Sequence, residues 1–315
     1  MFMEIILPLL AGVGLLYVGA ESLIRGSVAI AFRLGISALV IGLTVVAYGT
    51  SSPELFVSLQ ASIDGNSTIS LGNVIGSNIA NIGLILGIAA MIYPITISVE
   101  VIKREIPIMI SVTIIVVLML LDQGISRIEG MLLLGMLILY TVYNYMLARK
   151  EKTTIGEEEY QKEFKTPEKP LWINISFVVV GFVVLIIGSN LFVAGAVSLA
   201  KMFQISDLII GLTIIAVGTS LPEFATSVLA AIKKESDIAV GNVVGSNIFN
   251  VLGILGIVAI IHPIENAEIK VIDLGIVLLF AVVMIPVMKT GMKISRLEGF
   301  ILLMIYVVYV TSMIS

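Results

Sequence analysis

The sequence predicts an all-α polytopic membrane protein whose ten transmembrane helices form two inverted five-helix repeats. Three observations carry this prediction. Of the 315 residues, 58% are hydrophobic and 13% are charged, whereas roughly a quarter of the residues of a soluble domain are charged. Ten apolar segments are long enough to cross a bilayer as helices, which takes about 20 residues each. The second half of the chain also repeats the first.

Hydropathy bounds the ten predicted spans to within a few residues. They cover residues 4–22, 37–62, 69–93, 105–121, 126–147, 171–192, 206–232, 238–262, 271–288 and 296–314. The polar segment 148–170 mixes both charge signs and ends in prolines, so it is expected to link a first repeat, 1–147, to a second repeat, 171–315. The first span has no positive leader and carries Glu4, so it is expected to be retained rather than cleaved as a signal peptide.

One constant shift in numbering, which takes Glu54 to Glu223, places the first half on the second without a gap. "GTSSPE" at 49–54 meets "GTSLPE" at 218–223, and "GNVIGSNIAN" at 72–81 meets "GNVVGSNIFN" at 241–250, with eight of ten residues identical. Five spans per half is an odd number, so the second half must enter the membrane in the opposite orientation. Inverted repeats are typical of secondary transporters, which bind substrate at the midplane between the repeats.

The distribution of lysine and arginine predicts the orientation. With ten spans, 15 of the 18 basic residues fall on the side of the 148–170 linker, and only Arg127, Lys201 and Lys270 fall on the other. The positive-inside rule makes the linker side cytoplasmic. We therefore expect a multi-pass protein of the cell membrane with both termini external.

Composition excludes several classes of function. The chain has no cysteine, so disulfides and thiolate metal sites are absent. The net charge of −4, without alternating basic and aromatic residues, predicts no nucleic-acid partner. No cofactor and no obligatory protein partner are expected, and the expected surroundings are the lipid bilayer. We predict a protein that is not an enzyme.

Four spans carry polar residues where a bilayer is most apolar. They repeat at helical spacings of three or four residues, which place the side chains on one helix face. The first pattern is Thr50, Ser51 and Glu54, repeated as Thr219, Ser220 and Glu223, and the second is Ser77 and Asn81, repeated as Ser246 and Asn250.

Two prolines stand beside the two glutamates. Pro53 and Pro222 lack an N–H and crowd the carbonyl four residues back, so they are expected to break their helices near 47–50 and 216–219. Free carbonyls at that depth are tolerated where they line a cavity. A single buried Glu is sometimes a structural, hydrogen-bonded group, but two at equivalent positions indicate function.

The ligand atoms offered by these motifs are nearly all oxygens. Oxygen ligands suit hard cations such as Ca²⁺ and Na⁺, whereas Zn²⁺ or Cu⁺ prefers nitrogen or sulfur. The −2 charge of Glu54 and Glu223 is balanced by one Ca²⁺ or by several Na⁺, which suits exchange of one ion set for the other. The pairs Gly72–Gly76 and Gly241–Gly245 are expected to let the polar helices approach closely.

The chain resembles the cation/calcium antiporter superfamily, and most closely its prokaryotic sodium/calcium exchangers. The resemblance rests on "GTSSPE" and "GTSLPE", each followed by "GNVxGSNIxN", and covers the whole chain. It implies antiport of Na⁺ against Ca²⁺ by alternating access, in which spans 4–22 and 171–192 slide against the other eight.

The resemblance also implies roles for individual residues. Glu54 and Glu223 correspond to carboxylates that Ca²⁺ and Na⁺ share. The other expected ligand positions are the oxygens of Thr50, Ser51, Thr219 and Ser220, the backbone carbonyls of Ala47 and Ala216, the outer Na⁺ ligands Ser77 and Ser246, and the central amides Asn81 and Asn250.

Two departures bear on the ions carried. Some relatives, including the potassium-dependent branch, have an aspartate at one of the two positions that are Asn81 and Asn250 here, which weighs against K⁺ transport. Calcium/proton relatives have an acidic residue after "GN" in the first motif, where this chain continues with Val-Ile-Gly-Ser. Ca²⁺/H⁺ or K⁺-dependent exchange stays the alternative, and a channel or an intramembrane hydrolase with paired carboxylates is less favoured, since broken helices in inverted repeats indicate transport.

Overall fold

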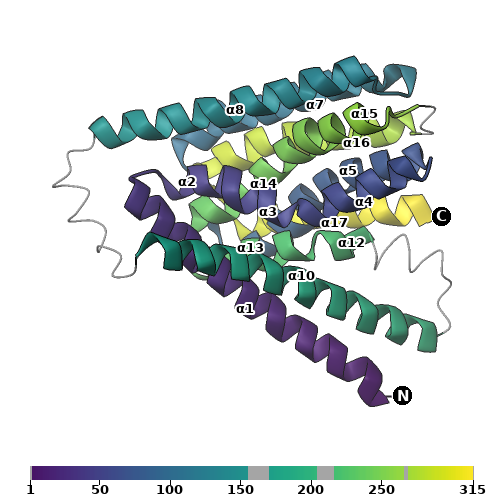
Figure 1. The fold of residues 1–315 in the computed structure, drawn as a ribbon, viewed down its shortest axis with the longest axis horizontal. Coiled ribbons are helices and arrows are strands. Elements are labelled where there is room, and N and C mark those ends of the chain that lie inside the picture. The colour runs from purple at the N-terminus through teal and green to yellow at the C-terminus, as the bar shows by residue number, and fades with distance from the viewer. Residues whose placement is uncertain (1, 155–169, 204–215, 266–268, 315) are drawn as a thin grey trace.

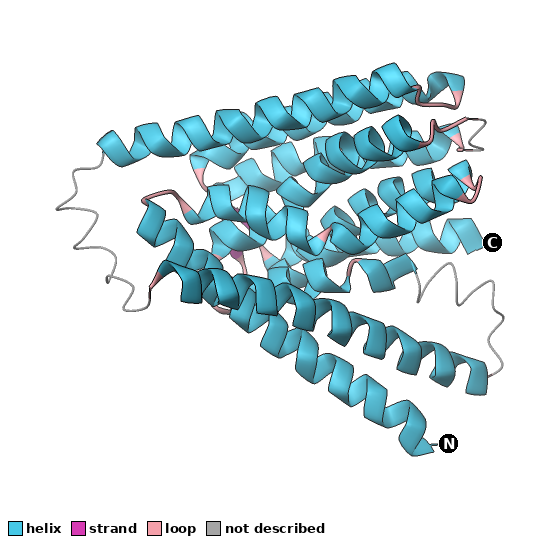
Figure 2. Ribbon diagram, viewed as in Figure 1, coloured by secondary structure: helices cyan, strands magenta, loops and turns pink. Residues whose placement is uncertain are grey.

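The structure is a computed structural model and describes residues 2–154, 170–203, 216–265 and 269–314. Nearly all regular structure within these ranges is helical (Figure 2). The first half contains α1 (Phe2–Leu34), α2 (Ala38–Ile41), the π-helix η1 (Gly42–Val46), α3 (Ala47–Thr50), α4 (Ser52–Ile63), α5 (Ser67–Ala80), the π-helix η2 (Asn81–Leu86), α6 (Gly87–Ile92), the π-helix η3 (Val101–Glu105), α7 (Ile106–Met119), the 3-10 helix η4 (Leu120–Asp122) and α8 (Arg127–Thr154).

The second half contains the corresponding helices. They are α10 (Leu171–Met202), α12 (Ala216–Thr219), α13 (Leu221–Ile232), α14 (Ser236–Phe249), the π-helix η6 (Asn250–Ile254), α15 (Leu255–Ile261), α16 (Val271–Lys289), the 3-10 helix η7 (Thr290–Met292) and α17 (Arg296–Ile314). Two two-residue strands, β1 (Ile95–Thr96) and β2 (Lys293–Ile294), pair antiparallel.

The described residues contain eight helices long and apolar enough to cross a membrane, or nine when the bent pair α2–α4 counts as one span. The predicted span 206–232 lies partly outside the described residues, and its described part forms α12 and α13. The prediction of an all-helical, multi-pass membrane protein is confirmed.

Three helices are longer than the sequence predicts. Helix α1 continues to Leu34 rather than residue 22, α10 to Met202 rather than residue 192, and α8 to Thr154 rather than residue 147. Hydropathy marks the end of an apolar segment, but a helix continues where its polar residues find partners. In α1, Arg25 lies beyond the predicted end and forms an ion pair one turn back with Glu21, which also pairs with Lys233 after the end of α13.

Figure 1 shows α1 and α10 side by side along one side of the molecule, with α8 along the opposite side. The outward faces of α8 and α10 expose large apolar side chains such as Leu139, 70% exposed, and Val179, 54% exposed. Helix α14 is almost wholly buried at the centre and packs on α2, η1 and α3. Apolar residues on the outside and polar residues at the centre are the arrangement expected of a protein surrounded by lipid.

Two short backbone pairings link the halves of the chain, and the numbering shift that relates the two motifs also relates these pairings. Ile95 pairs with Ile294 in the β1–β2 ladder, and Ile264 pairs with Ile125 in an isolated bridge. The shift that takes Glu54 to Glu223 also takes Ile95 to Ile264 and Ile125 to Ile294. Each half therefore pairs with the other through equivalent residues.

Glycines spaced seven residues apart form the contact between α1 and α10. A Cβ at Gly19 would lie 2.8 Å from the Leu185 backbone nitrogen, and one at Gly188 would lie 2.8 Å from that of Leu16. The residue numbers of the contacting positions increase along α1 while they decrease along α10, so the two helices are antiparallel. Only residues without a side chain let the two backbones approach this closely.

Gly188→Ala is therefore expected to destabilise the protein by about 1–3 kcal/mol, the usual effect of overpacking a tight contact. The added methyl group would meet the Leu16 backbone nitrogen and the Gly12 carbonyl, 3.1 Å away, neither of which can rotate aside. Thermal melting of the detergent-purified protein measures the change. Gly14→Ala is the matched control on α1, because no described atom lies within 4 Å of its added Cβ. Equal melting temperatures for the two variants would contradict this account of the contact.

Candidate functional site

The two polar helices are broken at equivalent residues. Helix α3 ends at Thr50 and α4 begins at Ser52, with a bend of 44° across the pair. Ser51 has φ −81° and ψ 8°, and Ser220, between α12 and α13, has φ −87° and ψ 8°. The predicted breaks are confirmed. They lie one residue beyond the expected ranges, because each proline occupies the first turn of the second helix of its pair.

One carbonyl released by these breaks has a partner from another helix. Pro222 cannot donate to the carbonyl of Gly218, and Ser189 of α10 donates to that oxygen instead, at 2.7 Å. The equivalent of Ser189 in the first half is Ala20, which has no hydroxyl. The contact of α10 with the broken helix thus includes a hydrogen bond that its repeat cannot form.

The carboxylates of Glu54 and Glu223 bind hydroxyls from the opposite half of the chain. Ser51 donates to Oε1 of Glu223 at 2.8 Å, and Ser220 donates to Oε1 of Glu54 at 2.8 Å. Both carboxylates are 1% exposed. Each half therefore supplies one acid and the hydroxyl that orients the other acid.

Four buried oxygens at this place have no hydrogen-bond partner among the described residues. They are Oε2 of Glu54, Oε2 of Glu223, Oδ1 of Asn81 and Oδ1 of Asn250. Buried polar atoms without partners cost free energy, so such atoms call for an explanation. The two amide oxygens can only accept or bind a cation, and so can the carboxylate oxygens when both acids are ionised, so the set suits Ca²⁺ or Na⁺.

The remaining predicted ligands lie around these oxygens. Ser77 Oγ lies 3.4 Å from Ser220 Oγ. The Ala47 carbonyl accepts hydrogen bonds from Thr50 at 3.3 Å and from Ser246 at 3.5 Å. Thr219 interacts with the carboxylate of Glu54, and Ala216 begins α12 as Ala47 begins α3. The structure thus brings residues from α3, α4, α5, α12, α13 and α14 into one region.

Asn81 and Asn250 each begin a π-helix, η2 and η6. A π-turn shifts the helical register by one residue, and such turns are common at functional sites. The third π-helix of the polar region, η1, ends directly before Ala47. Sequence periodicity did not predict these turns, because it reports the average helical repeat.

The sequence analysis also missed four asparagines that contact the predicted site. Asn73 donates to the Glu54 carbonyl at 3.1 Å and to Ser58 at 2.9 Å, and Asn242 makes the equivalent bonds to Glu223 and Ser227. Asn78 and Asn247 accept from the side chains of the predicted amides. Their recurrence at equivalent positions in "GNVIGSNIAN" and "GNVVGSNIFN" was the signal available.

The expected close approach of the glycine pairs is confirmed for one pair. A Cβ at Gly241 would lie 3.0 Å from the Gly42 Cα, and one at Gly245 would lie 2.4 Å from the Leu43 carbonyl oxygen. No described atom lies within 4 Å of a Cβ placed at Gly72 or Gly76. The shift between the two halves places the equivalents of Gly42 and Leu43 within 204–215, outside the described residues.

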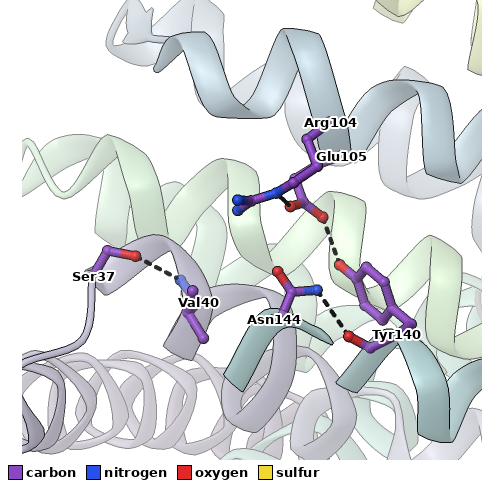
Figure 3. A network of polar contacts seen from close by, with 6 residues as sticks. All are labelled: Ser37, Val40, Arg104, Glu105, Tyr140 and Asn144. Carbon is purple, nitrogen blue, oxygen red and sulfur yellow. Dashed lines mark hydrogen bonds and ion pairs between the residues drawn. The ribbon is translucent and has the colours of Figure 1, made fainter. Parts of the chain in front are cut away.

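A buried carboxylate elsewhere in the protein shows how different the site is. Glu105, the last residue of η3, is fully buried, and Figure 3 shows it between Arg104 and Tyr140. Arg104 binds one carboxylate oxygen and the Tyr140 hydroxyl donates to the other at 2.8 Å. Both Glu105 oxygens are thus satisfied within the protein. Among the described residues, no Lys or Arg side chain pairs with Glu54 or Glu223 in this way. No group of three or more His, Cys, Asp or Glu that could hold a metal occurs in the described parts of the chain.

The fold and this oxygen-rich region define a multi-pass membrane transporter for hard cations. The profile of the sodium/calcium exchanger protein family matches residues 5–146 and 173–315. The chain belongs to the sodium/calcium exchanger family. Its function is antiport of Na⁺ against Ca²⁺ across a membrane, and the family is one of transporters rather than of enzymes.

Individual relatives are similar over nearly the whole chain. CaxA of Alkalimonas amylolytica, provisionally named as an antiporter, is 41% identical over 95% of both chains. The sodium/calcium exchanger MaX1 of Methanosarcina acetivorans is 32% identical over 96% of both. A solved structure of the sodium–calcium exchanger NCX_Mj, soaked with zero Na⁺ and Ca²⁺, matches with a TM-score of 0.84 and 32% identity over 99% of this chain and 100% of that one.

Proposed function

We propose that Ca²⁺ and Na⁺ bind in turn to one central site, built by both halves around Glu54 and Glu223. The observation that carries the proposal is the set of four unpartnered buried oxygens, two on these carboxylates and two on Asn81 and Asn250. Burying two carboxylates without a cation is costly. An empty site is therefore disfavoured, and this couples departure of one ion species to arrival of the other.

The remaining ligands follow from the contacts around the carboxylates. We assign hydroxyl or carbonyl oxygens to Ca²⁺ and Na⁺ at the positions of Ala47, Thr50, Ser51, Ser77, Ala216, Thr219, Ser220 and Ser246. Hydroxyls that orient the acids in the described arrangement can turn their lone pairs to a cation, since a hydroxyl both donates and accepts. Na⁺ carries one positive charge and Ca²⁺ carries two, so several Na⁺ spread over these oxygens balance the same two carboxylates as one Ca²⁺ does.

The proposed architecture is ten spans in two inverted repeats, 1–147 and 171–315, joined by the linker 148–170. The antiparallel course of α1 and α10, the equivalent bridges of Ile95 and Ile125, and the crossed Ser–Glu bonds support it. An inverted repeat gives two conformations of similar energy that exchange the roles of the halves. This is the physical basis for access from alternating sides.

The proposed orientation in the cell membrane has the linker in the cytoplasm and both termini outside. In Figure 1 the described chain ends, at α1 and α17, lie at the same end of the helices, while the end of α8 and the start of α10 lie at the opposite end. Together with the excess of basic residues on the linker side, this supports a cytoplasmic linker.

Ion flux in vesicles tests the function. Vesicles that contain the protein are loaded with Na⁺ and diluted into Na⁺-free buffer with labelled Ca²⁺, and Na⁺, K⁺ and pH are varied separately. We expect Ca²⁺ uptake that requires the outward Na⁺ gradient and is independent of K⁺. Uptake driven by a pH gradient without Na⁺ would instead identify a Ca²⁺/H⁺ exchanger, and a requirement for K⁺ would identify the potassium-dependent type.

A further inference from the structure

Two asparagine pairs cross between the halves beside the proposed site. Asn81 Nδ2 donates to Asn247 Oδ1 at 3.0 Å, and Asn250 Nδ2 donates to Asn78 Oδ1 at 3.0 Å. All four side chains are 2% exposed or less. Each residue of a pair thus comes from a different half, although Asn78 and Asn81 lie only one turn apart on one helix.

The hydrogen bonds determine which end of each amide is free. A side-chain amide has one accepting oxygen and one NH₂ group that donates. With the NH₂ groups of Asn81 and Asn250 bound, the oxygens of both amides are left without partners. An amide flipped end for end would present NH₂ hydrogens, which carry positive partial charge, to a cation.

The two accepting residues are held in turn by other atoms. Asn78 Nδ2 donates to the Asn247 backbone carbonyl at 3.2 Å. Asn247 Nδ2 lies 3.7 Å from the sulfur of Met109, a weaker acceptor. The Asn78 amide therefore has the firmer anchor, and both accepting oxygens point to the opposite half.

We propose that Asn78 and Asn247 are positioning residues that bind no ion themselves and instead hold the amides of Asn250 and Asn81 with their oxygens toward the transported cation. The proposal rests on the site assigned above. The proposal pairs Asn78 with Asn250 and Asn247 with Asn81, so each positioning residue acts on an amide of the other half. It does not pair Asn78 with Asn81 on the same helix, and this difference makes the proposal testable.

A double-mutant cycle measures the pairing. The readouts are the Ca²⁺ concentration that half-saturates Na⁺-driven uptake and the rise in melting temperature of the purified protein with Ca²⁺. Losing one buried hydrogen bond that orients a ligand is expected to raise half-saturating Ca²⁺ by about tenfold. Asn78→Ala is expected to raise half-saturating Ca²⁺ in the unmodified protein and also in the Asn81→Ala variant. In the Asn250→Ala variant, adding Asn78→Ala is expected to cause no further rise, because the bond between these two residues is already lost.

Asn73→Ala is the matched control, because Asn73 is also an asparagine on α5 but bonds to Glu54 and Ser58 and to neither amide. Its effect is expected to add fully to that of Asn250→Ala. The reciprocal cycle combines Asn247→Ala with Asn81→Ala, and the combined variant is expected to show no effect beyond that of Asn81→Ala; it provides a second test should Asn78→Ala fold poorly.

The outcomes separate this proposal from the site on which it rests. If Asn250→Ala alone raises half-saturating Ca²⁺ but its effect adds fully to that of Asn78→Ala, the positioning role is wrong and the site stands. If Asn250→Ala leaves both Ca²⁺ readouts unchanged, the assignment of Asn250 to the site is wrong and the positioning role falls with it.

Discussion

Glu54→Gln and Glu223→Gln are each expected to abolish Na⁺-gradient-driven Ca²⁺ uptake while leaving the protein folded. Either substitution leaves a single negative charge to balance a divalent cation in a water-poor interior. Removing one partner of a buried charge interaction costs about 3–5 kcal/mol, which corresponds to a loss of ion affinity of about a hundredfold or more. The reciprocal serine bonds predict equal effects for the two variants, since each acid has the same kind of partner from the other half.

Labelled-Ca²⁺ uptake into vesicles measures this loss, and thermal melting in Na⁺-free buffer establishes that each variant is folded. Glu265→Gln provides the matched control, because Glu265 is an exposed glutamate outside the site. The control is expected to transport as the unmodified protein does. Uptake at the unmodified rate in both Glu54→Gln and Glu223→Gln would show that the acids do not carry the ions.

Gly245→Val is expected to destabilise the protein by about 3 kcal/mol or more and to abolish transport, as severe overpacking does. A Cβ at Gly245 would lie 2.4 Å from the Leu43 carbonyl oxygen and 2.8 Å from the Ala47 Cβ. Backbone atoms cannot turn away from the new side chain, so α14 has to separate from η1 and α3. The separation would move the Ala47 carbonyl and Thr50 away from the opposite half.

Melting temperature, elution from a size-exclusion column and Ca²⁺ uptake together measure this effect. The matched control is Gly275→Ala on α16, because no described atom lies within 4 Å of the added Cβ and alanine favours the helix over glycine. The control is expected to melt at or slightly above the temperature of the unmodified protein. A Gly245→Val protein that melts and transports normally would show that α14 does not need to approach the η1–α3 segment so closely.

Much of the site could be predicted from the sequence because the chain is duplicated. A buried carboxylate beside a proline has several explanations, but its recurrence at the equivalent position of the second half leaves few. Proline geometry is local, so the breaks at Ser51 and Ser220 were predicted to within a residue or so. Thr50 and Glu54 are both buried, as expected, although the break at Ser51 places them on the two separate helices α3 and α4.

Other features could not be predicted because they depend on contacts between segments distant in the chain. The length of α1 depends partly on its contact with α10 of the other half, since a Cβ at Gly26, beyond the predicted end, would lie 2.7 Å from the Asn174 carbonyl oxygen. Asn78 was not singled out from the sequence, because its role depends on a bond to the opposite half, from Asn250, and Asn81 likewise bonds to Asn247 of the opposite half. The glycines seven residues apart were visible in the sequence, but their meaning required knowing that α1 and α10 are neighbours.

The sequence by itself determined the class of protein, the duplicated motif and the supply of oxygen ligands, since hydropathy, proline chemistry and residue spacing are properties of the chain. Only the tertiary structure decided which acid pairs with which hydroxyl, and which amide oxygens are left without a partner. These are outcomes of packing two halves against each other, and the chain encodes them through side-chain shape and close backbone approach rather than through any local pattern.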